Sequence, residues 1–243
     1  MMEDFIGVWR KTGLQRHGIM FGYYAPYAKV PLGIKAVVVW IYEPPQKMAG
    51  DGIDLDPYPL DLTKAEQLAA LTGLKVIGQV YTDLVDDGSG KGTVVKKRNV
   101  ASFMWSSGEL ALAADFQSRY PSMTRHAPAD DQGRHTFGSK FVTVVISGDL
   151  EGHVAPEAYM CSDFAAALYH DRIVEPSIDP RLIRVKESSK ELYVPEIFWK
   201  GKNEYGLMVR TAAKGAIPVE YGIVSVLLLS RIWAWSQRGL FSR

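Results

Sequence analysis

The chain has 243 residues, of which 47% are hydrophobic and 23% are charged, and these proportions are ordinary for a packed globular protein. Its 28 basic and 27 acidic residues nearly cancel, so the charge gives no support for nucleic acid or an anionic membrane as a partner. The single cysteine, Cys161, excludes an intrachain disulfide and a zinc cluster built from several thiolates.

Neither the N-terminus nor the most apolar segment predicts a targeting or membrane element. Glu3 and Asp4 stand where a secretory signal would carry a basic run, so we expect no such signal. Residues 223–229 are too few for a membrane-spanning helix, which needs about 20 apolar residues. We expect them to form a buried strand or helix in a soluble intracellular protein.

Segments rich in β-branched and aromatic residues predict the strands of the fold. They are residues 35–42 (KAVVVWIY), 74–81 (LKVIGQVY) and 140–147 (KFVTVVIS). Their apolar residues are nearly continuous rather than alternating. This pattern is typical of strands covered on both faces, as in a sheet that lies between helices.

A helix is predicted between the first two of these strands. Residues 62–74 carry apolar side chains at roughly helical spacing. Thr63 and Glu66 have the spacing of a capping box, and Gly73 is a natural C-terminal stop.

Two further helices are predicted later in the chain. Ser106 and Glu109 form a second capping-box pattern, and the helix that they begin ends near Arg119. The alanine-rich residues 156–172 predict a third helix, in which Cys161 is a small buried residue. Alternation of strands and helices predicts a mixed α/β fold.

Polar stretches between these elements predict loops. Residues 83–93 combine acids with glycines, and residues 121–138 are polar and contain His126 and His135. Beyond residue 179 the sequence changes to short apolar pieces separated by prolines. We expect this part to be an extended segment that packs back on the main domain.

The glycine-rich residues 88–93 are similar to a phosphate-binding loop, but the pattern fails in one respect. Such a loop needs a lysine followed directly by serine or threonine, whereas Gly92 separates Lys91 from Thr93. A surface hairpin is the favoured interpretation. No histidines are paired at metalloprotease spacing and no Gly-x-Ser-x-Gly string surrounds a nucleophile, so neither of these hydrolase signatures is present.

A set of short strings in a fixed order is distinctive. The strings are WRKTG at 9–13, QRHG at 15–18, VPLGIKAV at 30–37, IYEPPQ at 41–46, YTDL at 81–84, SKFVT at 139–143, YVPEIF at 193–198, NEYG at 203–206 and PVEY at 218–221. Together they resemble the nuclear protein localization protein 4 family, from its MPN domain to the opening of its C-terminal domain. The resemblance runs from about Phe5 to Tyr221.

This resemblance implies an adaptor. Members of the family act with ubiquitin fusion degradation protein 1 as the cofactor of a hexameric AAA ATPase segregase, valosin-containing protein. They recruit proteins that carry ubiquitin chains and serve proteasomal and endoplasmic-reticulum-associated degradation, in the cytoplasm and nucleus and at the periphery of the endoplasmic reticulum. The family's ubiquitin-like and zinc-finger regions, which make much of the ATPase contact, lie outside this sequence. We therefore do not expect this chain alone to dock directly on the ATPase.

The MPN domain is similar to metal isopeptidases of the JAMM type, and the resemblance implies where a zinc site would fall. Active relatives use a glutamate base, a His-x-His-Pro string and a Ser-x-x-Asp string. The matching positions here hold Gln15, Tyr81 with Asp83, and Ser106 with Glu109. An amide cannot accept the proton and both imidazoles are gone, so we expect no catalytic residue, no bound metal and no cofactor.

We therefore predict an α/β fold in which an MPN-like domain (1–178) has a mixed central sheet flanked by helices. The start of the family's C-terminal domain (179–221) and a tail that does not match the family (222–243) follow. Candidate contacts with ubiquitin or a partner are Asp86, Asp87, Lys91, Phe103, Trp105 and Ser106. For Phe103 and Trp105 a place in the core is the alternative.

Two other functions stay open at this point. One is an active metal-dependent isopeptidase with atypical ligands. The other is a degenerate fragment that keeps no partner, because fold alone does not fix function.

Overall fold

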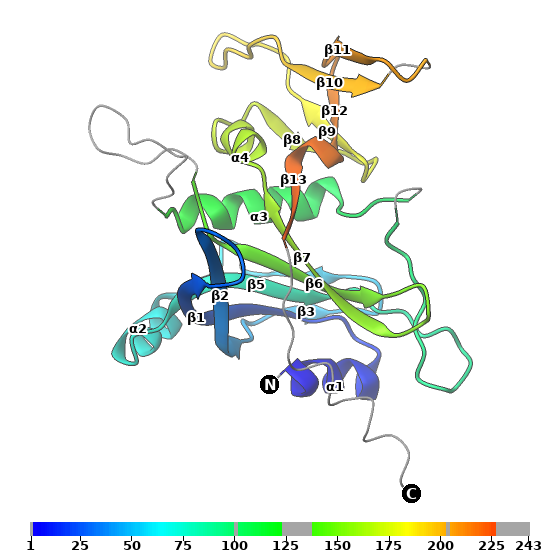
Figure 1. Cartoon of the computed structure of the whole chain (residues 1–243). Coiled ribbons are helices and arrows are strands. Elements are labelled where there is room, and N and C mark those ends of the chain that lie inside the picture. Colours follow the sequence, from blue (N-terminus) through cyan, green and yellow to red (C-terminus); the bar gives the residue numbers. More distant parts are fainter. Residues whose placement is uncertain (1, 100–101, 123–137, 203–204, 227–243) are drawn as a thin grey trace, which may run out of the picture.

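A six-stranded mixed sheet forms the centre of the molecule. The computed structural model describes residues 2–99, 102–122, 138–202 and 205–226 (Figure 1). The strand order is β13-β7-β6-β5-β1-β2, with β5 and β6 parallel and the other neighbours antiparallel. The strands are β1 (His17–Tyr27), β2 (Gly33–Tyr42), β5 (Lys75–Thr82), β6 (Val142–Gly148), β7 (Val154–Cys161) and β13 (Ile223–Val226). The predicted mixed α/β fold is confirmed.

Helices cover both faces of this sheet, as predicted. They are α1 (Met2–Thr12), α2 (Thr63–Leu71), α3 (Ser107–Arg119) and α4 (Asp163–His170). Helix α1 packs Phe5, Ile6 and Trp9 against one face, in the same hydrophobic cluster as Val80 of β5 and Ile146 of β6. Helix α3 lies on the opposite side of the sheet from α1 (Figure 1).

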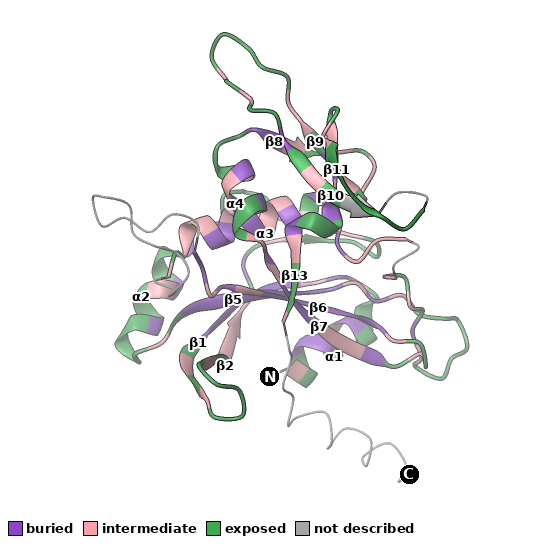
Figure 2. Cartoon of the chain, turned by 45° about the horizontal axis from the view of Figure 1, so that its top comes forward, coloured by how far each residue is buried: buried purple, intermediate pink, exposed green. Residues whose placement is uncertain are grey.

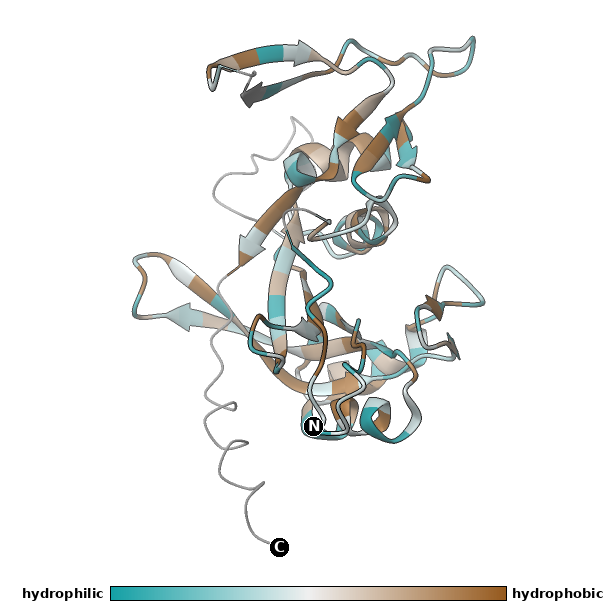
Figure 3. Ribbon diagram, turned by 90° about the vertical axis from the view of Figure 1, so that its right-hand side faces the viewer, coloured by the Kyte–Doolittle hydropathy of each residue, from teal (hydrophilic) through white to brown (hydrophobic). Residues whose placement is uncertain are grey.

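The C-terminal part packs back on the main body, as the sequence predicts. It contains β8 (Val174–Pro176), β9 (Leu182–Val185), β10 (Phe198–Lys202), β11 (Met208–Ala212), β12 (Ala216–Pro218) and the short 3-10 helix η1 (Val219–Gly222). Its small sheets lie at the end of the molecule opposite α1 (Figures 1 and 3). Ile183, Ile197 and Ile217 share one buried cluster with Leu110 of α3, so the two parts have a common core.

The prediction that residues 35–42 are covered on both faces is wrong. They belong to β2, which among the described strands pairs with β1 alone, at the edge of the central sheet, and whose residues are half-buried or exposed. By contrast, β5 and β6, predicted at 74–81 and 140–147, are buried along nearly their whole length (Figure 2). The apolar run in β2 misled the prediction because it cannot distinguish a central strand from an edge strand.

The predicted helix at 156–172 is also wrong over its first half. Residues 154–161 form β7, whose backbone pairs with β6 on one side and β13 on the other. Helix α4 begins only after Ser162, whose side chain accepts a hydrogen bond from Ala165 N. Alanine has the highest helix propensity of all residues, but the preference is small in energy, and ladder bonds to two neighbouring strands outweigh it. Cys161 is buried as expected, but at the end of a strand.

One of the two predicted capping boxes does not form. Helix α2 has Leu62 at its N-cap and no side-chain cap, whereas Glu66 accepts a hydrogen bond from the Tyr120 hydroxyl at 2.6 Å. The predicted stop is confirmed, because Gly73 follows the C-cap residue with a φ of +71°. Such a φ favours glycine.

Some predicted features lie outside the described residues. Of the apolar residues 223–229, the first four form β13 and the rest are not described. His126 and His135, with most of the predicted loop at 121–138, also fall outside. Among the described helices, none is long and apolar enough to cross a membrane.

Candidate functional site

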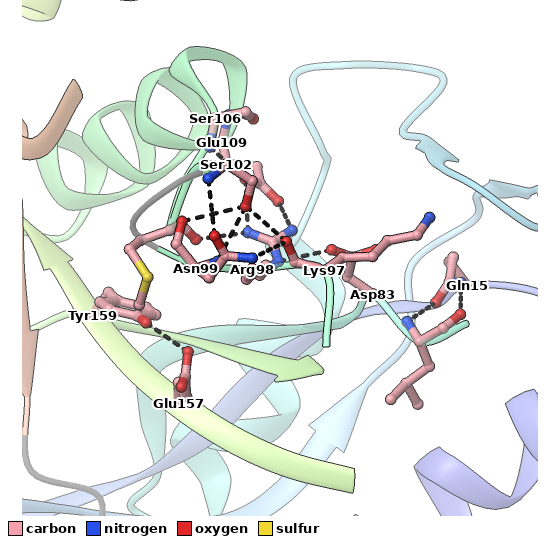
Figure 4. Close-up of polar contacts among 12 residues, drawn as sticks. Gln15, Asp83, Lys97, Arg98, Asn99, Ser102, Ser106, Glu109, Glu157 and Tyr159 are labelled. Carbon is pink, nitrogen blue, oxygen red and sulfur yellow. Dashed lines mark hydrogen bonds and ion pairs between the residues drawn. The ribbon is translucent and has the colours of Figure 1, made fainter. Parts of the chain in front are cut away.

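The positions that the resemblance assigns to a metal site meet at the C-terminal end of β5. Tyr81 is the second-last residue of this strand and Asp83 directly follows the strand, while Glu109 lies in the first turn of α3. The capping box predicted at Ser106 is present: its hydroxyl accepts from Glu109 N at 3.2 Å, and Ser106 N donates to Glu109 Oε2 at 2.7 Å. The cap therefore fixes the carboxylate that faces Asp83 across the site (Figure 4).

A residue that the sequence analysis did not single out fills the space between these carboxylates. The Arg98 side chain is only 4% exposed. Its Nε donates to Asp83 Oδ2 at 2.7 Å, and its Nη1 and Nη2 donate to Glu109 Oε2 and Oε1 at 3.0 and 2.5 Å (Figure 4). Nη1 also donates to the Met104 carbonyl at 3.0 Å. The guanidinium thus makes a two-pronged contact with Glu109 and single contacts with the other two groups.

The electrostatics of the site follow from this buried ion pair. Burial raises the pKa of Glu109, but the hydrogen bonds and charge of Arg98 and the N–H of Ser106 outweigh burial and lower it below its ordinary value. Burial opposes the charge of Arg98 as well, yet Tyr81, Glu109 and Asp83 raise the pKa of its guanidinium above the ordinary value. Both groups are therefore charged at neutral pH.

Tyr81 does not supply a base to this site. Its side chain is buried, and its hydroxyl has hydrogen-bond geometry with none of the described residues. Burial and the negative charge of Glu109 raise the pKa of Tyr81 well above its ordinary value, an effect that Arg98 only partly offsets. The phenol is therefore neutral. The Arg98 guanidinium lies 5.7 Å from the centre of its ring.

Gln15, the position matched to a glutamate base, is a structural clamp. It is 2% exposed. Its Nε2 donates to the Leu84 and Gly50 carbonyls at 2.7 and 2.8 Å, and its Oε1 accepts from Leu84 N at 3.1 Å. The amide therefore joins the connection between α1 and β1 to the loops that contain Gly50 and Leu84. It does so by donating N–H groups to their carbonyls, and a carboxylate has no N–H to donate.

The candidate contacts at 83–93 lie on an exposed hairpin-like turn. Asp86, Asp87 and Lys91 are exposed, and an isolated bridge between Asp86 and Val94 closes the turn. Asp86 Oδ1 accepts from Gly88 N, and Asp87 Oδ1 accepts from Ser89 N, each at 2.8 Å. These bonds agree with the predicted surface hairpin and fix its backbone.

The two aromatic candidates differ in position. Trp105 is fully buried in the cluster that includes Leu110, which is the alternative that the sequence left open. It cannot contact a partner in the folded protein. Phe103 is half-buried, and its ring centre lies 5.7 Å from the Arg98 guanidinium. Ser106 is half-buried at the start of α3.

Among the described residues, three metal-binding side chains, Asp149, Glu151 and His153, gather with their ligand atoms within 4.8 Å of one another. These residues form the turn between β6 and β7. Asp149 Oδ1 accepts from both Glu151 N and His153 N at 2.8 Å, so the cluster has a sufficient explanation as a turn.

Arg98 was missed because its sequence environment gives no signal for burial. It ends the basic run Lys96-Lys97-Arg98, which by itself is typical of a solvated surface. Only the fold brings it between Asp83 and Glu109. The one clue to a buried cation was the pair of carboxylates, Asp83 and Glu109, for which no positive partner was predicted. Using this clue required knowing that both carboxylates face the same space.

Comparison with known proteins gives one consistent result. The model of the NPL4 family matches residues 16–229. Proteins named nuclear protein localization protein 4 from Debaryomyces hansenii, Meyerozyma guilliermondii and Schizosaccharomyces pombe are 43%, 44% and 39% identical over 226, 229 and 226 residues. Each match covers 93% of this chain but only 39%, 39% and 38% of the relative. The chain thus spans less than half the length of these relatives.

Proposed function

The chain belongs to the NPL4 family, and from this premise we infer that it is a non-catalytic adaptor module that binds ubiquitin chains on proteins destined for unfolding and degradation. The partners of this proposal are polyubiquitin and ubiquitin fusion degradation protein 1. The hexameric AAA ATPase valosin-containing protein is a partner of the complex, without direct docking by this chain alone. Its place of action is the nucleus and cytoplasm, including the surface of the endoplasmic reticulum. The proposal includes the MPN-like assignment of residues 1–178.

The observation that carries the non-catalytic part is the state of the site at the end of β5. The space between Asp83 and Glu109 holds the Arg98 guanidinium, and all three groups are committed to one another. Gln15 uses its amide to bind carbonyls, so no free base stands at that position. These contacts favour a structural ion pair over a centre that activates water.

The proposed binding surface is the exposed part of the 83–93 turn, from Asp86 to Lys91, together with the half-buried Phe103. The turn carries charges of both signs, Asp86 and Asp87 with Lys91, on a backbone fixed by its own hydrogen bonds. A fixed turn loses little conformational entropy on binding. Trp105 is left out of the surface because it is buried.

A pull-down tests the adaptor with two probes, ubiquitin chains and the C-terminal tail of ubiquitin fusion degradation protein 1. We expect the full chain to retain both. The triple variant Asp86→Asn, Asp87→Asn, Lys91→Gln should lose most of the ubiquitin retention, because the amides keep the turn's hydrogen bonds but remove its charges. The matched control is Asp149→Asn with Glu151→Gln, which removes charge from another exposed turn.

If the unaltered chain retains neither probe, the adaptor is wrong and the chain is a fragment without partners. Equal retention by the triple variant and the control would move the ubiquitin surface elsewhere. Cleavage of isopeptide-linked di-ubiquitin together with stoichiometric zinc would replace the adaptor with an isopeptidase.

A further inference from the structure

We propose that Arg98 is a tethered cation: its guanidinium holds Asp83 and Glu109 together, and its removal leaves a site for a free guanidinium ion. This inference concerns how the site is held together and does not depend on the proposed function. It rests on the contacts of one side chain with groups from three separate segments.

The carboxylates need a cation because of where the chain places them. Asp83 follows β5 and Glu109 begins α3, and their side chains are only 22% and 21% exposed. A carboxylate that is largely withdrawn from water is unfavourable unless a positive charge and hydrogen bonds compensate it. Arg98, itself 4% exposed, lies between the two and contacts both.

The shape of the site fits a guanidinium rather than an ammonium. Four N–H···O contacts leave Arg98 toward Asp83, Glu109 and the Met104 carbonyl, out of the five N–H bonds that the group has. The contact with Glu109 is two-pronged, which only a planar fork can make. The rings of Tyr81 and Phe103 each lie 5.7 Å from the guanidinium carbon, so they supply cation–π attraction as well.

A consequence is that the charge, and not the side-chain stem, is what the site requires. Replacing Arg98 with alanine removes the guanidinium and leaves its acceptors facing the space that it occupied. A free methylguanidinium ion offers the same planar donors. Its binding to the folded form alone would raise the unfolding midpoint in proportion to the logarithm of its concentration.

The experiment compares the thermal midpoints of the full chain, Arg98→Ala and Arg181→Ala in methylguanidinium chloride and in sodium chloride of equal ionic strength. Arg181 forms an exposed pair with Asp179 and its side chain is 61% exposed, so its removal leaves no enclosed site. We expect Arg98→Ala to start from a lower midpoint. At ten times the dissociation constant its midpoint should rise by about 3–6 °C, with no specific rise in the other two proteins. Equal shifts in all three proteins would overturn the proposal.

A second set of variants decides the question if Arg98→Ala does not fold. Arg98→Met keeps most of the stem and removes the charge, and it should unfold at a lower midpoint than the unaltered chain. Adding Asp83→Asn and Glu109→Gln removes the two uncompensated negative charges, and glutamine still serves in a capping box. We expect this triple variant to recover a large part of the lost midpoint. A triple variant no more stable than Arg98→Met alone would show that Arg98 acts by packing, and the tethered cation would be wrong.

Discussion

Gln15 and His17 lie two residues apart and both are buried. At each position the fold accommodates a neutral side chain. Gln15 donates two hydrogen bonds to carbonyls and accepts one from Leu84 N. His17 contacts Gln79 Oε1 through Nε2 at 2.9 Å, and Gln79 Nε2 in turn donates to Thr143 Oγ1 at 3.0 Å. At both positions the partners of the side chain decide which chemical form the fold accepts.

Restoring a carboxylate by Gln15→Glu should destabilise the fold rather than install a base. The introduced carboxylate would face the Leu84 and Gly50 carbonyls without a proton to donate. We expect a loss of about 2–4 kcal/mol in the free energy of unfolding at pH 7, measured by urea denaturation. Gln67→Glu makes the same change at an exposed position of α2 and should cost less than about 0.5 kcal/mol. A loss equal to that of the control would contradict the clamp.

His17 should make stability depend on pH. Burial lowers the pKa of His17 to about 4, an effect that the bond to Gln79 only partly opposes, from an ordinary value of 6.5. Between these two values the unfolded chain binds the proton and the folded chain does not, so stability rises with pH across this window. The contribution is about 3 kcal/mol, fully present above pH 6.5 and lost as the pH falls toward 4.

The pH effect is measured as a difference between variants. Unfolding free energies of the unaltered chain and of His17→Phe, taken from pH 4 to 7, should diverge as the pH rises. The control is substitution of the exposed His153 by glutamine, measured over the same pH range. Parallel profiles for the unaltered chain and His17→Phe would show that His17 does not titrate as described.

At the scale of single elements, β1 is held against its neighbours by close backbone approaches. Its register with β2 shifts between Phe21 and Gly22. A Cβ added at Gly22 would lie 1.9 Å from the Val37 carbonyl oxygen, and one added at Gly18 would lie 2.4 Å from Ile41 Cγ2. No strand is predicted from the sequence at residues 17–27, and these glycines are the reason, because glycine ordinarily weakens a strand pattern.

The same substitution should therefore have opposite effects in two elements. Gly22→Ala forces the Val37 backbone of β2 to move and should cost about 1–3 kcal/mol. Gly7→Ala, in the middle of α1 with nothing within 4 Å of the added Cβ, should stabilise the protein by about 0.5–1 kcal/mol. Urea denaturation of both variants checks the signs. Equal effects would mean that the bulge in β1 yields to a methyl group.

At the scale of the whole molecule, β13 links the C-terminal part to the central sheet. Ile223 to Val226 pair with β7 from Cys161 to Ala158, and the Gly222 carbonyl accepts from Ser162 N at 2.8 Å. Upstream of β13, the extension already shares a buried cluster with α3 and α4. The C-terminal part is therefore attached to the rest of the molecule in two ways, by a common hydrophobic core and by the pairing of β13 with β7.

Two shortened chains measure what this sheet edge contributes. A chain that ends at Val226 keeps β13, and one that ends at Gly222 lacks it and leaves the outer edge of β7 unpaired. We expect the shorter chain to be less stable by about 1–3 kcal/mol, since it loses the β13–β7 ladder. Thermal unfolding of the two chains gives the difference. Identical midpoints would show that the β13–β7 ladder does not contribute to stability.

The sequence by itself determined the mixed α/β class, β5 and β6, the helix that begins at Ser106 and the family. These features have local causes: continuous apolar runs, a capping box and short motifs in a fixed order. It also singled out Asp83 and Glu109, but it could not say what fills the space between them.

The tertiary structure alone decided the rest. It made residues 154–161 a strand because ladders with β6 and β13 outweigh the helix preference of alanine. It also made β2 an edge and buried Arg98 between two carboxylates 15 and 11 residues away along the chain. The physical reason is common to these cases: each depends on a partner brought close by folding, and no local pattern encodes the identity of that partner.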